Sequence, residues 1–159
     1  MTDPMDAFRT LQPAIDSGDV QLEPCEIFDH LKVIVDHPMG ELRLTYVSMS
    51  GGQAAGIVQF VKADPFNNLP CFSIGYAVHE SLRKQGLATR IVADALAELE
   101  NGLRGTSLKR YYVEAVVSTS NEASKRIASR FISDAPVSIT DEFSGEPALQ
   151  YMRLFPRSG

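Results

Sequence analysis

The sequence contains little cysteine and little histidine. Its 159 residues include two cysteines, Cys25 and Cys71, and three scattered histidines. Two cysteines cannot form a disulfide framework, and none of these residues has the close spacing of a zinc site. We therefore expect two buried thiols in a protein of a reducing compartment, and no bound metal ion.

The sequence also lacks long apolar runs and an excess of basic residues. No apolar stretch approaches the roughly 18 residues of a membrane span, and the acidic N-terminus does not resemble a secretory signal. The 15 Lys and Arg against 20 Asp and Glu give a net charge of −5. General nucleic-acid binding requires a basic excess. We expect a cytoplasmic protein that binds neither membranes nor nucleic acid.

What is present is an ordinary globular composition. Hydrophobic residues make up 44% of the chain and charged residues 22%, which excludes disordered, collagenous and coiled-coil classes. A chain of this length is expected to form one domain, spanning residues 1–159.

Three segments have helical periodicity. Apolar residues recur every three or four positions in residues 4–16, 86–100 and 121–131. Asn101 and Gly102 are predicted to end the second helix, and Thr119 with Glu122 has the spacing of a capping box for the third.

Strands are predicted in most of the remaining chain, and residues 27–36 are ambiguous between helix and strand. Residues 64–70 are predicted to form a loop, because they are rich in turn-forming residues. The predicted strands are 20–22, 41–47, 54–61, 71–78, 111–117, 137–140 and 148–155. This order predicts an α/β or α+β fold with one sheet layer and helices on its faces.

The segment from Phe72 to Thr89 carries the chemical signal. An apolar strand leads into a short basic turn with one glycine and then directly into a helix. The first amides of a helix lack internal partners, and its dipole is positive at that end, so this turn could bind an anion. The alternative is a strand-to-helix turn with incidental surface charge. The turn matches neither a Walker loop nor a dinucleotide fingerprint.

The same residues resemble the GNAT family, the Gcn5-related N-acetyltransferases. Residues 83–88, Arg-Lys-Gln-Gly-Leu-Ala, match the family signature (Gln/Arg)-x-x-Gly-x-(Gly/Ala). The preceding Ile74–His79 resembles the family's fourth strand, and Ser118–Ser124 resembles its fifth-strand exit with an N-x-x-S pattern. The resemblance covers roughly residues 40–155 and is greatest to the ribosomal-protein alanine acetyltransferases.

The resemblance implies a mixed, mostly antiparallel sheet of six to seven strands that splays between the fourth and fifth. Acetyl-CoA would be the co-substrate, with its pantetheine arm in the gap and its pyrophosphate on the amides of residues 84–89. A backbone amide near Val78 would polarise the thioester carbonyl, Asn121 would bind pantetheine and Ser124 would face the sulfur. The implied cofactor-binding residues are Ala77, Val78, His79, Arg83, Lys84, Gln85, Gly86, Leu87, Ala88, Thr89, Asn121 and Ser124.

The chain departs from the family pattern on the last predicted helix. Many relatives have a tyrosine general acid near position 128, where this chain has Ala128. Ser124 is the candidate substitute, unless it only packs or caps. Many relatives also end this helix with Gly-Phe, whereas this chain has Arg130-Phe131, so the following turn is expected to differ.

An amine acceptor needs a base, because amines are mostly protonated at neutral pH. Glu114 on the fifth strand is the first candidate, with a simple cross-strand carboxylate as its alternative role. His79, with a suitable ordinary pKa, and a chain of waters are further candidates.

The function that the resemblance implies is direct acetyl transfer from acetyl-CoA to an amine, without a metal. The alternatives are a longer acyl-CoA or another acceptor group, and a non-catalytic or regulatory CoA-binding domain. A homodimer is left open.

Charge is distributed unevenly along the chain. Residues 1–82 carry a net charge of −7 and residues 83–130 one of +4. By resemblance, the acceptor cleft would be built from the acidic parts, which would attract a cationic amine such as a polyamine or a peptide N-terminus. The alternative is an acidic surface that only aids solubility.

Overall fold

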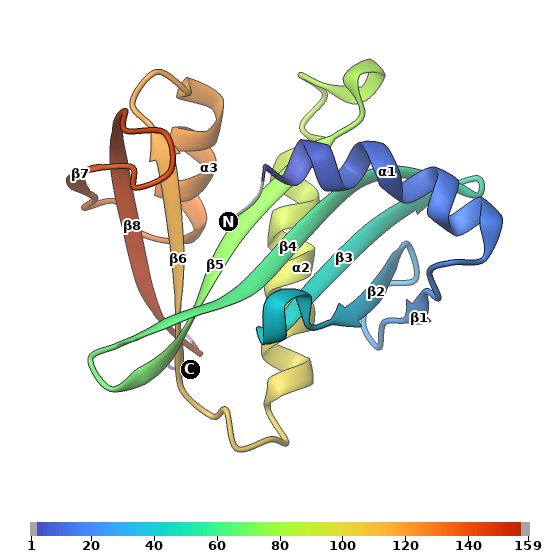
Figure 1. Cartoon of the computed structure of the whole chain (residues 1–159), viewed down its shortest axis with the longest axis horizontal. Coiled ribbons are helices and arrows are strands. Elements are labelled where there is room, and N and C mark those ends of the chain that lie inside the picture. The colour runs from blue at the N-terminus through green and yellow to red at the C-terminus, as the bar shows by residue number, and fades with distance from the viewer. Residues whose placement is uncertain (1–2, 157–159) are drawn as a thin grey trace.

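The structure is a computed structural model that describes residues 3–156 (Figure 1). Within these residues the chain forms three helices and eight strands, together with two short 3₁₀ turns, η1 and η2. In order, the elements are α1 (Pro4–Ser17), β1 (Glu23–Pro24), β2 (Leu31–Asp36), η1 (Pro38–Gly40), β3 (Arg43–Ser50), β4 (Gln53–Phe66), β5 (Leu69–Val78), η2 (Glu80–Leu82), α2 (Leu87–Leu103), β6 (Tyr111–Ser118), α3 (Glu122–Phe131), β7 (Val137–Thr140) and β8 (Pro147–Phe155).

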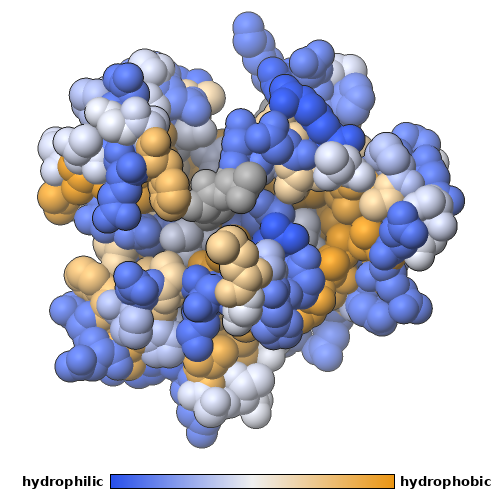
Figure 2. All heavy atoms as spheres, viewed as in Figure 1, coloured by the Kyte–Doolittle hydropathy of each residue, from blue (hydrophilic) through white to orange (hydrophobic). Residues whose placement is uncertain are grey.

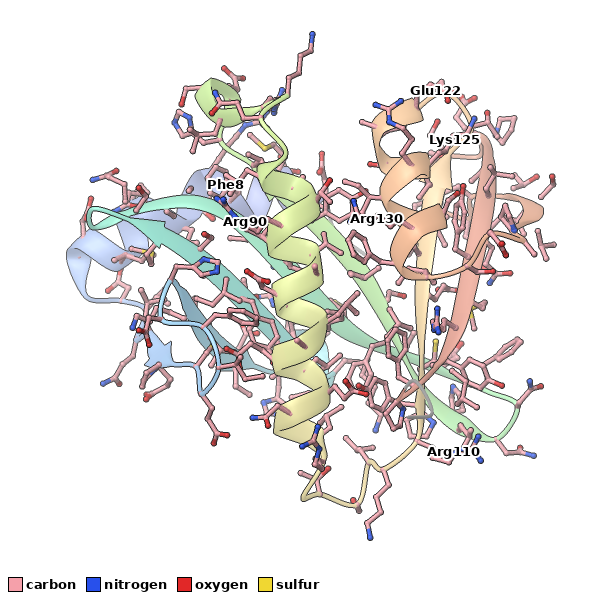
Figure 3. The ribbon with its side chains drawn as sticks, turned by 180° about the vertical axis from the view of Figure 1, so that it is seen from behind. Phe8, Arg90, Arg110, Glu122, Lys125 and Arg130 are labelled. Atoms are coloured by element: carbon pink, nitrogen blue, oxygen red, sulfur yellow. The ribbon has the colours of Figure 1, made fainter. Side chains whose placement is uncertain are left out.

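All eight strands belong to one sheet, in the order β1-β2-β3-β4-β5-β6-β8-β7. Every neighbouring pair is antiparallel except β5 and β6, which are parallel. Helix α1 covers one face, whereas α2 and α3 cover the other (Figures 1 and 3). The predicted α+β fold is confirmed. The sheet has one strand more than the upper expectation of seven, because the ambiguous segment 27–36 supplies β2. The expected strand 20–22 lies instead at residues 23–24, as β1.

Helix α1 forms the smaller of two hydrophobic cores. The Asp3 carboxylate caps its first turn by accepting a hydrogen bond from the Met5 amide at 3.0 Å. Phe8 and Leu11 lie one turn apart on the inner face. Both are buried in a cluster with apolar residues of β3, β4 and β5. This packing holds α1 beside the strand that precedes the predicted anion-binding turn.

Helix α2 packs across the other face and extends further than predicted. Gly56 on β4 permits this contact, because a Cβ there would lie 2.9 Å from the Ile91 Cδ1 atom. The helix continues beyond Asn101 and Gly102 to Leu103, whose side chain is buried in the main core. Burial of Leu103 thus extends the helix past the predicted stop.

The ambiguous segment 27–36 divides into a loop and the strand β2. The loop is fixed to α2 by Glu98, a carboxylate that is only 4% exposed. Its Oε2 atom accepts hydrogen bonds from the Phe28 amide at 2.8 Å and the Ile27 amide at 3.1 Å. His30 adds a second tie through Asp94 on α2, with a distance of 2.8 Å between Nε2 and Oδ2.

The predicted loop 64–70 is wrong, because β4 and β5 form one long hairpin. Asn67 and Asn68 have φ of 48° and 64°, the left-handed backbone that a two-residue hairpin turn requires. The register shifts between Ala63 and Phe66. This irregularity accommodates Pro65, which cannot donate to a regular ladder.

Helix α3 begins with a different cap from the one predicted. Asn121, not Thr119, is the N-cap, and its Oδ1 accepts a hydrogen bond from the Ser124 amide at 3.1 Å. Glu122 does not complete a capping box but pairs with Lys125, at 3.0 Å from Oε1 to Nζ. The helix then ends at Phe131, as predicted.

Candidate active site

Strands β5 and β6 separate soon after they meet. They pair at only three positions: Cys71 with Tyr112, Phe72 with Val113, and Ser73 with Glu114. Beyond Ser73, β5 continues to Val78 beside β4 alone, and β6 continues to Ser118 beside β8 alone, in the part of the chain that the structure describes. The predicted splay is present. The strands that resemble the family's fourth and fifth strands are β5 and β6 in this structure. An extended ligand in such a gap can hydrogen-bond to both edges.

A cavity of about 240 Å³ lies at the end of β5, next to the start of α2. Four of its lining residues were predicted from sequence to bind cofactor, namely Ala77, Val78, Arg83 and Ala88. Met5 and Tyr76 complete the lining and were not predicted. The cavity therefore joins the end of the gap to the basic turn.

The turn between β5 and α2 is rigidly organised at its beginning. His79 caps η2: its Nδ1 accepts a hydrogen bond from the Ser81 amide at 3.2 Å and lies 2.8 Å from the Ser81 hydroxyl. The Nδ1 atom of His79 is thus already engaged in capping η2. This makes it a weaker candidate for the base than Glu114.

The amides at the start of α2 are open to a ligand. Gly86 is the N-cap, with φ of 75°, and no side chain of residues 3–156 caps the helix. The first helical hydrogen bond is donated by the Arg90 amide to the Gly86 carbonyl. The amides of Leu87, Ala88 and Thr89 therefore lack helical partners. Together with the helix dipole, they make a site for an anionic group.

Three side chains of the turn lie at the surface. Arg83, Lys84 and Gln85 are exposed, as is Gly86 itself. The Gln85 amide nitrogen donates to the Ser81 carbonyl at 3.1 Å. Lys84, like Gly86, has left-handed backbone, with φ of 63°. Two cations therefore stand beside the open amides.

Asn121 and Ser124 lie across the gap, at the start of α3. The Asn121 side-chain oxygen is used in capping, and its amide nitrogen has no hydrogen-bond partner among residues 3–156. The role that sequence predicts for Asn121 therefore falls to that NH₂ group. Ser124 is half-buried on the first turn of the helix.

Tyr76 is the residue of this region that sequence reasoning missed. Its side chain packs on the face of the sheet that carries α2 and α3. The hydroxyl oxygen is fully buried, and no hydrogen-bond partner for it exists within the described part of the chain. Burial raises the pKa of Tyr76, while Ser124, as a nearby donor to the phenolate, opposes that rise. An apolar run such as residues 71–78 gives no sign that one of its hydroxyls lies at a cavity.

Glu114 lies at the last β5–β6 pair, where the strands begin to diverge. Its two carboxylate oxygens accept hydrogen bonds from the Ser73 hydroxyl at 3.1 Å and the Gln150 side-chain amide at 2.6 Å. These bonds join β5, β6 and β8. Glu114 is thus a cross-strand tie, and it stands at the closed end of the gap.

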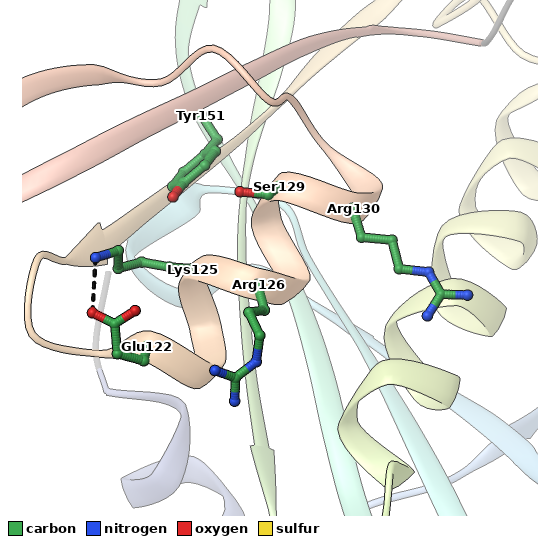
Figure 4. Close-up of a pocket in the computed structure, with 6 residues that line it drawn as sticks. All are labelled: Glu122, Lys125, Arg126, Ser129, Arg130 and Tyr151. Atoms are coloured by element: carbon green, nitrogen blue, oxygen red, sulfur yellow. Dashed lines mark hydrogen bonds and ion pairs between the residues drawn. The ribbon is translucent and has the colours of Figure 1, made fainter.

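A larger hollow of about 470 Å³ follows the outer side of α3 (Figure 4). It is lined by three cations and one carboxylate, together with Ser129 and Tyr151. Figure 4 shows Arg130 extending towards α2 while Lys125 bends back to Glu122. Arg126 also lies at this surface. The hollow is therefore positively charged, on the same face as α2.

The two thiols are poor nucleophiles. Burial, and secondarily Glu114, raises the pKa of Cys71 to about 11. Burial and the Glu98 carboxylate raise that of Cys25 to about 11 as well. Cys71 is buried as predicted, whereas Cys25 is only partly buried. No group of three or more potential metal ligands is found among residues 3–156, and no helix there is long and apolar enough to span a bilayer.

The family follows from comparison with known proteins. Residues 31–131, more than half of the chain, match the family model of the acetyltransferase (GNAT) domain. The chain therefore belongs to the GNAT family of acetyltransferases. No protein of curated function matches the sequence.

Solved structures share the fold. A GNAT-family acetyltransferase from Streptococcus pneumoniae is 14% identical, with a TM-score of 0.54 over 72% of this chain and 67% of that one. An acetyltransferase from Salmonella typhimurium, described as modifying the N-terminal serine of ribosomal protein L7/L12, is 22% identical, with a TM-score of 0.51 over 72% and 64%. A ribosomal-protein-S5-alanine acetyltransferase from Vibrio fischeri is 14% identical, with a TM-score of 0.52 over 71% and 61%.

The aligned part of this chain spans about three fifths to two thirds of the length of these structures. At such low identity the similarity concerns the fold. Two of the three are described as ribosomal-protein acetyltransferases.

Proposed function

We propose that the chain is an N-acetyltransferase that moves the acetyl group of acetyl-CoA directly to an amine. The observation that carries this proposal is the three-pair contact of β5 and β6, which opens towards the uncapped start of α2. A strand gap suits an extended amide-containing arm, and open helix amides suit a pyrophosphate. The family supports the same co-substrate.

Different residues around the gap would bind different parts of acetyl-CoA. The amides of residues 84–89, with the cations Arg83 and Lys84, would hold the pyrophosphate. The Val78 amide would donate to the thioester oxygen as negative charge develops there. On the other side, Asn121 would bind the pantetheine arm. Arg126 and Arg130 would place further positive charge near the nucleotide end of the molecule (Figure 4).

Glu114 is the proposed base, acting directly or through water. It stands at the point of divergence, and its existing bonds to Ser73 and Gln150 would hold the carboxylate in place. Loss of the proton from an ammonium acceptor frees the lone pair that attacks the thioester carbon. In Glu114→Gln the remaining carbonyl can still accept from Gln150, while the Ser73 hydroxyl must turn to accept from the new NH₂ group. Glu100→Gln on α2 is the matched control.

The acceptor is proposed to be a cationic amine. Helix α1 lies on the β5 side of the gap and the β7–β8 hairpin on its β6 side (Figure 1). The turn of that hairpin carries exposed Glu142 and Glu146. Figure 2 shows hydrophilic residues over much of this face, with hydrophobic patches between them. A negative rim would raise the encounter rate of a cationic acceptor.

Release of free CoA with a panel of amines tests the function. We expect turnover with at least one amine and faster turnover with cationic than with neutral or acidic ones, decreasing as salt is added. A chain that binds acetyl-CoA in calorimetry but releases no CoA with any amine would instead be a CoA-binding regulatory domain. Equal turnover of cationic and neutral amines, insensitive to salt, would contradict the acceptor proposal alone.

A further inference from the structure

We propose that Tyr76 is the proton donor to the sulfur of the departing CoA, with Ser124 beside its hydroxyl. This inference rests on the proposed acetyl transfer and adds a catalytic residue to it. Its basis is the place of Tyr76 on β5, beyond the last pair with β6 and in the lining of the 240 Å³ cavity, with its buried hydroxyl near Ser124 of α3.

The position of Tyr76 follows from strand register. Tyr76 lies three residues beyond Ser73, the last residue of β5 that pairs with β6. It pairs with Val58 of β4 on its other side, so the strand is fixed there. The Tyr76 side chain lines the 240 Å³ cavity with Val78, whose amide is the proposed donor to the thioester oxygen. Tyr76 is thus placed where the reacting group of an extended ligand would pass.

The Tyr76 hydroxyl is protonated and unpartnered, as a proton donor must be before the reaction. It is buried without a hydrogen-bond partner among residues 3–156, although buried polar groups are usually paired because desolvation is costly. Ser124 approaches from α3, on the opposite side of the gap, without meeting hydrogen-bond geometry. Burial holds the pKa of Tyr76 above its usual range, so the phenol is protonated at neutral pH. A partner from a bound ligand would satisfy it.

Tyr111 shows that burial alone does not define the site. Its hydroxyl is also buried and unpartnered in the described structure. Tyr111 begins β6, one residue before its first pair with β5, and its ring packs against Phe72 and Phe155. It does not line the cavity at the end of β5. Tyr111 is therefore a matched control with the same buried group outside the gap.

The proposed step balances as follows. The amine lone pair forms the C–N bond, and the C–S bond breaks with its electron pair going to sulfur. The Tyr76 O–H gives its proton to that sulfur, producing the CoA thiol and a phenolate. The base releases the ammonium proton to solvent and then takes the second proton from the acylated nitrogen. The phenolate regains a proton from solvent, with the Ser124 hydroxyl as the nearest relay. No oxidant or metal is required.

The test compares Tyr76→Phe with Tyr111→Phe, each checked for folding by thermal unfolding. We expect Tyr76→Phe to lower kcat by about 100-fold or more, the range for general acids, while calorimetry gives a Kd for CoA within about threefold of the parent chain. Tyr111→Phe should leave kcat unchanged. Ser124→Ala should cost less than Tyr76→Phe, and little in addition to it, because both would act in one proton path.

The outcomes separate this inference from the function on which it rests. A parent chain that releases no CoA with any amine refutes acetyl transfer, and the role of Tyr76 with it. A parent chain that turns over while Tyr76→Phe keeps the kcat of Tyr111→Phe refutes the role of Tyr76 alone. If Tyr76→Phe does not fold, Tyr76→3,5-difluorotyrosine keeps the hydroxyl and makes it more acidic. An unchanged kcat, measured below the lowered pKa, then refutes proton donation.

Discussion

Gly86 offers the sharpest test of the anion site, because its surroundings separate two effects. A Cβ at Gly86 would meet nothing within 4 Å in the described structure. Substitution there therefore acts through backbone conformation rather than steric overlap. The φ of 75° is left-handed, which costs a residue with a side chain about 1–2 kcal/mol, and a β-branched residue more.

The expected result combines stability and binding. Gly86→Ala should lower the free energy of unfolding by about 1 kcal/mol. Gly86→Val should also displace the amides of Leu87 to Thr89 and weaken acetyl-CoA binding at least about tenfold, or 1.4 kcal/mol. Urea unfolding and calorimetry measure the two quantities. Gly102→Ala is the matched control on the same helix, where the exchange should stabilise by about 0.5–1 kcal/mol and leave affinity unchanged.

Two results would refute this reasoning. A folded Gly86→Val with unchanged affinity for acetyl-CoA would show that the start of α2 does not hold the pyrophosphate. Equal stability changes at Gly86 and Gly102 would show that the left-handed backbone at residue 86 carries no cost.

Three further expectations concern the Glu98 hydrogen bonds to the loop before β2, the pKa of Cys71 and the binding of acetyl-CoA by Asn121. Glu98→Ala should lower the free energy of unfolding by about 2 kcal/mol, because two part-buried amides each lose an acceptor, at the lower end of the usual range of about 1–3 kcal/mol. Glu100→Ala, measured likewise in urea, should change it by less than about 0.5 kcal/mol. The raised pKa of Cys71, about 11 in the folded chain, means that the unfolded chain loses the thiol proton first, so stability should fall as pH rises from 9 to 11. Urea unfolding at pH 8 and 10 should show a smaller fall for Cys71→Ala, and an equal fall would contradict the assignment. Asn121→Ala should raise the KM for acetyl-CoA in steady-state assays, and an unchanged KM would remove Asn121 from the cofactor site.

Periodic elements were predictable from sequence, whereas the ends of elements and the turns were less so. The apolar rows of α1 and α2 define each helix by themselves. The end of α2 was missed because burial of Leu103, a tertiary contact, outweighs the local stop signal. The loop 64–70 was wrong because two asparagines complete the turn alone, leaving both prolines in strands.

The candidate site divides in the same way. The turn around Gly86 was predictable because its chemistry is contiguous in sequence. The cavity residues Met5 and Tyr76 were not, because Met5 comes from α1, distant in sequence. The capping role of Asn121 was missed because residue spacing cannot tell whether its side-chain oxygen accepts from the helix or from a ligand.

The brief contact between β5 and β6 also makes the gap a natural reporter of occupancy. Backbone amides that face the gap have no sheet partner in the described chain, whereas those facing β4 and β8 are held in continuous ladders. Hydrogen exchange should therefore be uneven along Ile74–Val78, with protected and unprotected amides alternating within one strand. A ligand that adds itself between the strands would slow only the unprotected set. Within β5, the amides that face the gap would thus report ligand binding, and the amides that face β4 would serve as an internal reference.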